Sequence, residues 1–75
     1  MKLSELLTVL KDSMVIRVHD VRSIDVFMGE VSIAGMEIPE RYQNAVIINV
    51  FTEYFKGWGK TGLTIVVTTR GGSHE

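Results

Sequence analysis

The stretch AVIINVFTEYFKGWGKTGLTIVVTT, residues 45–69, decides the fold of this chain. Apolar side chains recur with a period of two over residues 45–55, and this alternation predicts a strand. Residues 63–69 are β-branched at six of seven positions, which is typical of a second strand. A short glycine-rich loop lies between the two segments, so we expect them to form an antiparallel hairpin.

The loop of this hairpin contains the tripeptide GKT, residues 59–61, which is also the end of a phosphate-binding signature. That signature requires another glycine five residues before Gly59 and a helix after the tripeptide. Tyr54 stands at the glycine position, and a predicted strand follows where the helix N-terminus would complete the anion site. We therefore exclude a nucleotide-binding loop and interpret the glycines of this loop as residues that permit positive φ angles, namely Gly57, Gly59 and Gly62.

Aromatic and cationic side chains gather around the same loop. Aromatic rings beside lysines are typical of protein interfaces and of surfaces that bind single-stranded nucleic acid. An alternative needs no partner: Trp58 folds back over the open end of the sheet, and both lysines are simply solvated. We predict a partner-binding site that consists of Tyr54, Phe55, Lys56, Trp58 and Lys60.

The N-terminal segment predicts one helix, over about residues 2–11. Glu5 in its first turn and Lys11 at its end suit the helix dipole. Four leucines recur at the spacing of one helix face, which we expect to lie on a sheet: Leu3, Leu6, Leu7 and Leu10.

Two further strands are expected between this helix and the hairpin. Residues 14–19 alternate with a period of two, and a polar turn follows them. The next strand is predicted over residues 24–33, with its apolar positions changing faces after Gly29, so we expect a bulge or bend there. Residues 34–35 end this strand, and Pro39 suits the start of a short helical turn.

These elements predict an α+β domain over residues 1–69. Every link between strands is short, which favours an antiparallel sheet of four to five strands, strongly bent and packed by the N-terminal helix. Such a sheet could close into a small SH3-like or Sm-like barrel. Residues 70–75, RGGSHE, are expected to form a disordered tail.

The size and composition of the chain limit how it is stabilised. A domain of 75 residues buries only about 60% of the surface that its unfolded chain exposes. Disulfides, metals or a partner subunit often stabilise such small domains. The chain has no Cys, and two His, one of them in the tail, do not make a structural zinc site. We expect no cofactor and no metal, and predict self-association.

The charge and hydropathy of the chain predict neither a membrane-spanning segment nor a highly charged partner such as nucleic acid. The formal net charge is −1. The longest unbroken apolar run, residues 45–48, is far shorter than a membrane span. The N-terminus has Glu5 within its apolar stretch and lacks a cleavage site, so no signal peptide is expected and the cytoplasm is the predicted location.

One acid/base cluster is conceivable, at the polar turn between the first two strands, and it involves His19, Asp20, Asp25 and Glu30. Catalysis requires such groups to converge in a pocket, whereas these residues are predicted at a turn or on solvent-exposed faces of strands. No Ser-His-Asp set can be assembled, because His19 is the sole His outside the tail. We predict that the chain is not an enzyme, and interpret the charged residues 37–43 as a solvated cover over one end of the core.

Several short motifs of the chain resemble those of small phage and prophage proteins of Gram-positive bacteria, which are of unknown function. The motifs are MKLSELLTVLKD at residues 1–12, VIRVHD at 15–20, GEV at 29–31, IPE at 38–40 and LTIVV at 63–67. The chain departs from this group in the long segment FTEYFKGWGKTG, residues 51–62, where those proteins have a tighter turn. The resemblance implies a bacterial cytoplasm during phage carriage, and it implies no catalytic residue.

The expected topology alone is similar to that of the Sm-like barrels, which assemble into RNA-binding rings. An N-terminal helix before a bent sheet, with Gly29 midway along a long second strand, carries this likeness. The RNA-contacting motifs of that family are not recognisable here. We therefore predict a phage-type accessory protein that acts as a non-enzymatic interaction module, self-associates and binds a host or phage protein; the alternative is an Sm-like oligomer that binds single-stranded nucleic acid.

Overall fold

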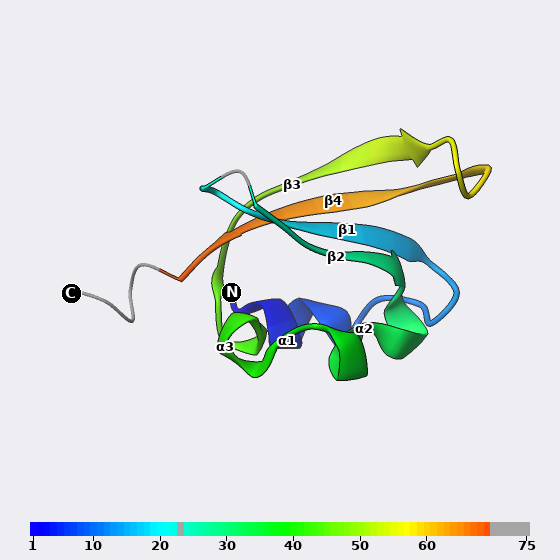
Figure 1. Ribbon diagram of the computed structural model, residues 1–75. Helices are drawn as coiled ribbons and strands as arrows, with labels where there is room; N and C mark the ends of the chain where they lie inside the picture. The colour runs from blue at the N-terminus through cyan, green and yellow to red at the C-terminus, as the bar shows by residue number, and fades with distance from the viewer. Residues whose placement is uncertain (23, 70–75) are drawn as a thin grey trace.

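The computed structural model describes residues 1–22 and 24–69, and the expected tail lies outside the described residues. It confirms the α+β class (Figure 1). The elements follow in the order α1 (Leu3–Leu7), β1 (Val15–Asp20), β2 (Ile24–Glu30), α2 (Val31–Glu37), α3 (Glu40–Gln43), β3 (Val46–Phe55) and β4 (Lys60–Thr68).

The four strands form one sheet in the order β2-β1-β4-β3. β1 pairs with β2 and β3 pairs with β4, each as an antiparallel hairpin, and the two hairpins join through β1 and β4, which run parallel. The expectation of a wholly antiparallel sheet is therefore wrong at its centre. Parallel neighbours need a crossover connection. The chain between β1 and β4 contains α2 and α3, which lie between β2 and β3 in sequence and carry the chain across the sheet.

The sheet is open. β2 and β3 are its two edges, so in the described part of the chain the expected closure into a barrel is not found. α1, α2 and α3 lie together on one face of the sheet, and in the described part of the chain no helix lies on the opposite face (Figure 1). The β3–β4 hairpin extends beyond the helical layer at one end of the molecule (Figure 1).

The core lies between the helices and the sheet. The leucine side chains of the N-terminal segment pack against it as expected, although α1 ends at Leu7. The Thr8 hydroxyl donates to the carbonyl of Glu5 (2.7 Å), and such a local side-chain bond competes with continuation of the helix. The buried cluster consists of Leu3, Ile16, Val18, Phe27, Val31, Ala34, Ile38, Tyr42, Ala45, Ile65 and Val67.

The second strand is shorter than predicted, because β2 ends at Glu30 and residues 31–37 form α2. Val31 and Ala34, three residues apart, are the buried positions of this helix. The change of face after Gly29 therefore marks the start of helical spacing, not a strand that changes sides. Of the register shifts in the sheet, the one in the β1–β2 pair lies between Val18 and His19.

Pro39 precedes α3 directly, as expected for the start of a short helical turn. Tyr42 of this turn is buried, so residues 37–43 do more than cover the core. Its hydroxyl donates to Oδ2 of Asp20 (2.6 Å), and the Arg22 guanidinium donates to the same oxygen (2.8 Å). This contact joins α3 to the end of β1.

Candidate functional site

The candidate site is the hairpin tip, residues 56–59, with the strand ends on either side of it. The carbonyl of Phe55 accepts hydrogen bonds from the N–H groups of Trp58 and Gly59, both at 2.9 Å, and these bonds close the turn. Gly59 has a φ of 65°, the left-handed region that favours glycine. Within the described residues it is the one glycine with positive φ, so this expectation is wrong for Gly57 and for Gly62, which lies inside β4.

The hairpin brings four of the five predicted site residues to the surface. Tyr54 is 62% exposed and Trp58 is 42% exposed, so neither ring is enclosed by the rest of the domain. Lys56 is exposed, and the Nζ atom of Lys60 lies 4.0 Å from a carboxylate oxygen of Glu30. Tyr54 pairs with Thr61 and Lys60 pairs with Phe55, so the side chains of Tyr54 and Lys60 lie on opposite faces of the hairpin.

Phe55 is placed differently from the other four, because it is only 3% exposed. Its ring lies over the backbone of Gly62, which has no side chain to occupy this space. Phe55 thus anchors the hairpin to the sheet, and Tyr54 and Trp58 are left as its exposed rings.

The outer edge of β3 continues from this tip along the sheet. Its first residues are already paired: the N–H of Leu3 donates to the carbonyl of Ala45 (2.9 Å), and the N–H of Ile47 donates to the carbonyl of Met1 (3.0 Å). From residue 48 to residue 55 no strand of the described part of the chain covers this edge. The sequence analysis did not predict this free edge. Residues 46–55 contain a single charged side chain, and this low charge could have indicated a strand edge open to pairing.

The acid/base cluster expected from the sequence separates in three dimensions. His19 and Asp25 come together on the open face of the sheet, with Nδ1 of His19 2.8 Å from Oδ1 of Asp25. Arg17 donates to the same carboxylate (3.0 Å), and hydrogen bonds from His19 and Arg17 lower the pKa of Asp25. Asp20 lies instead on the helix side of the sheet, buried against Tyr42.

A shallow hollow of about 290 Å³ lies beside His19 on the open face. Its polar groups bind one another: the Thr64 hydroxyl donates to Glu53, and Arg17 lies 3.6 Å from the second oxygen of that carboxylate. These contacts pair Arg17, Glu53 and Thr64 with one another within the sheet. Its lining consists of Arg17, His19, Phe51, Glu53, Thr64 and Val66.

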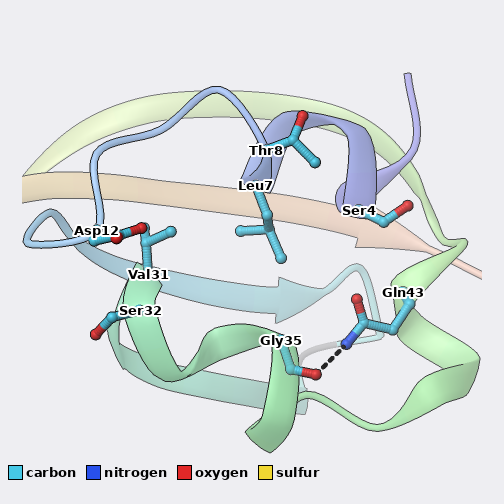
Figure 2. Close-up of a pocket in the computed structure, with 8 residues that line it drawn as sticks. All are labelled: Ser4, Leu7, Thr8, Asp12, Val31, Ser32, Gly35 and Gln43. Atoms are coloured by element: carbon cyan, nitrogen blue, oxygen red, sulfur yellow. Dashed lines mark hydrogen bonds between the residues drawn. The ribbon is translucent and has the colours of Figure 1, made fainter.

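A second hollow, of about 320 Å³, opens on the helical side between α1 and α2 (Figure 2). The Gln43 amide donates to the carbonyls of Gly35 and Ile38, both at 3.2 Å, and so fixes α3 to α2. Thr8, which bonds the carbonyl of Glu5, and Gln43 thus use their polar groups in local structure. Its lining consists of Ser4, Leu7, Thr8, Asp12, Val31, Ser32, Gly35 and Gln43.

Residues 1–22 and 24–69 lack two further kinds of feature. Within these ranges, no group of three or more His, Cys, Asp or Glu side chains is placed to hold a metal ion. No helix in them has both the length and the apolar composition required to cross a membrane.

Comparison of the chain with protein-family models, curated proteins and solved structures found no match.

Proposed function

We propose that this chain is a non-enzymatic interaction module of phage type, which self-associates and binds another protein through the tip of the β3–β4 hairpin. The observation that carries the proposal is the joint exposure of Tyr54 and Trp58 at that tip. Trp and Tyr are among the side chains that contribute most to binding at protein interfaces. The proposal places the chain in the bacterial cytoplasm, in line with its resemblance to phage and prophage proteins.

The construction of the hairpin supports this role. The buried ring of Phe55 and the two hydrogen bonds to its carbonyl hold the turn in one conformation before a partner arrives. A pre-organised surface loses less conformational entropy on binding than a mobile loop. Lys56 and Lys60 flank the exposed rings, so a partner with carboxylates around an apolar recess would fit this tip.

Affinity capture tests the proposal. The full chain is used as bait in extracts of its native host, beside a Trp58→Ala variant and a Met36→Ala variant, which alters an exposed residue of α2 outside the hairpin. We expect a protein that the wild type and Met36→Ala capture equally and Trp58→Ala does not. The captured protein is then purified and titrated against the wild type.

Trp58 is the only tryptophan of the chain, so the fluorescence of this chain reports on the tip once the emission of the partner alone is subtracted. Burial of the indole by the partner should shift its emission to shorter wavelength. Capture that is unchanged by Trp58→Ala would contradict the proposal. Unfolding of Trp58→Ala, seen by circular dichroism, would also contradict it, because the indole would then be a core residue.

A binder of single-stranded nucleic acid through the same tip is the second candidate. Exposed rings next to Lys56 and Lys60 favour it, because bases stack on aromatic side chains and phosphates attract ammonium groups. A titration of the wild type with short oligonucleotides at low salt tests it. Quenching of Trp58 that weakens steeply with added salt would support nucleic-acid binding, and an unchanged emission would eliminate it.

A further inference from the structure

The directions of the peptide groups along β3 identify a second interaction surface. The carbonyl of Ala45 and the N–H of Ile47 bind the N-terminal residues, so both point away from β4. Peptide groups of a strand point alternately to its two sides. Without an irregularity, the odd-numbered residues of β3 would continue to point outward.

The register shift between Ile47 and Asn49 changes this alternation. Ile47 lies opposite Val67 and Asn49 lies opposite Val66, so β3 has one extra residue at this point. A bulge of one residue exchanges the inward and outward positions that follow it. Beyond the bulge, the outward peptide groups therefore belong to Val50, Thr52 and Tyr54.

These three residues offer a regular set of unpaired groups. Each has one N–H and one carbonyl directed away from β4, which gives six hydrogen-bonding groups along an edge that no described strand covers. Their side chains share one face of the strand, because side chains alternate with a period of two. All three residues are exposed.

We propose that a second copy of this chain pairs antiparallel with residues 48–55 of β3, about a two-fold axis at Thr52. In this register Thr52 lies opposite Thr52 of the second copy, and Val50 lies opposite Tyr54 on both sides of the axis. The three pairs satisfy all the outward groups with six main-chain hydrogen bonds. The result is a continuous sheet of eight strands, since each copy contributes four.

The side chains agree with this register. Thr–Thr pairs and pairs of an aromatic with a β-branched residue are favourable across neighbouring antiparallel strands. Val50, Thr52 and Tyr54 provide these kinds of pair and no charge. An axis at Glu53 would instead place two carboxylates opposite each other, which is unfavourable. The self-complementarity of the edge is the reason to assign it to a second copy, because a two-fold contact requires one surface to match itself.

The charge of the edge strand supports the same assignment. Glu53 is the only charged residue of β3, and its carboxylate is bound by Thr64 and lies near Arg17 within its own chain. β3 contains neither of the residues, Lys and Pro, that proteins commonly use to prevent pairing at an edge. The opposite edge, β2, carries Asp25 and Glu30 within seven residues and suits self-pairing less well.

The dimer rests on the proposed function in one respect only, which is self-association. Tyr54 belongs to both surfaces, because it would pair with Val50 of the second copy. Trp58, Lys56 and Lys60 lie beyond the paired residues, so each copy would keep these three side chains for another protein. The two ideas therefore fail separately. A chain that stays monomeric but loses its partner on Trp58→Ala would overturn the dimer and leave the hairpin proposal intact.

The test is the molecular mass of the full chain in solution, measured by sedimentation equilibrium from micromolar to millimolar concentration. We expect the wild type to reach about 17 kDa, twice the 8.4 kDa of one copy. Thr52→Lys and Thr52→Glu should each remain at the mass of one copy, because two like charges then meet at the axis. An equal mixture of the two variants should recover the mass of two copies, since opposite charges then face each other.

A matched control is Met28→Lys, which adds the same charge to an exposed residue of the other edge strand and should leave the dimer unchanged. Circular dichroism verifies that each variant is folded. A wild type that stays at the mass of one copy at millimolar concentration would overturn the proposal. A dimer that persists in Thr52→Lys, or a mixture that stays monomeric, would overturn it as well.

Discussion

A Cβ atom on Gly62 would lie 1.9 Å from the carbonyl oxygen of Val15. This contact lies where the two hairpins of the sheet join, because β1 and β4 are the central parallel pair. The ring of Phe55 would lie 2.8 Å from the same Cβ. The final glycine of the GKTG segment is thus required by close packing of strands and not by a phosphate or a turn.

Replacement of Gly62 by alanine should therefore separate β1 from β4 or displace Phe55. We expect Gly62→Ala to lower the free energy of unfolding by about 3 kcal/mol, the upper part of the range for an overpacked interior. Gly57→Ala is the matched control: its Cβ would meet nothing within 4 Å, and a change within about 0.5 kcal/mol is expected. Urea denaturation measures both. Equal stability of the two variants would show that the backbones are not in close contact.

The hydroxyl of Tyr42 is one of the donors that stabilise the buried carboxylate of Asp20. Tyr42→Phe removes this donor without changing the shape of the core. A hydrogen bond to a charged group contributes about 1.5–3 kcal/mol, and we expect a loss of stability in that range by urea denaturation. Tyr54→Phe, which changes an exposed ring, should leave the stability of the monomer unchanged.

Asp20 should also make the stability of the domain depend on pH. Hydrogen bonds from Arg22 and then Tyr42 hold the pKa of this carboxyl well below its ordinary value of 3.8. A lowered pKa in the folded state means that the stabilisation is complete above the unfolded-state pKa and is lost as pH falls through the folded-state value. We expect the urea midpoint to fall progressively below about pH 4. Asp20→Asn should be less stable than the wild type at pH 7, and the difference should narrow in acid; a constant difference would contradict this role.

Leu3 connects the N-terminus to the core and to the start of β3. Its side chain is fully buried, and its N–H donates to the carbonyl of Ala45. Leu3→Ala should destabilise the domain by about 2–4 kcal/mol through lost burial and the cavity that remains. Val9→Ala, at an exposed position of the same segment, should have an effect within about 0.5 kcal/mol. Similar urea midpoints for the two variants would refute the placement of Leu3.

Much of the local structure followed from the sequence. The period of two placed the β3–β4 hairpin correctly, and the leucine spacing placed α1 on the core, because both signals arise within short segments. The parallel pairing of β1 with β4 did not follow, since it depends on how two hairpins pack after a helical crossover. Residues 31–33 were mistaken for a strand, because a short apolar run fits either a strand or a buried helix.

The candidate site was predictable to a similar degree. The composition of the loop pointed to its rings as a candidate site but left open whether Trp58 folds back over the sheet; Tyr54 and Trp58 are exposed in the structure. The burial of Phe55 depends on the space above Gly62, which no local pattern reveals. The extent of the free edge of β3 could not be predicted from local patterns. It is set by residues 1–3, which cover residues 45–47 through a contact between distant parts of the chain.

The most direct test of edge-to-edge pairing is one distance between the two copies. The chain has no Cys, so Met28→Cys allows a single spin label on β2, where Met28 is exposed. The strand pairings align Met28 across the sheet with Phe51, the residue next to the proposed axis. Seven steps of about 4.8 Å separate β2 from β2 of the second copy, so pulsed electron paramagnetic resonance should give a distance near 34 Å. Pairing through β2 would place the two labels well below 20 Å apart on the same strand spacing, and such a distance would contradict pairing through β3. The absence of any coupling between the labels would contradict it as well.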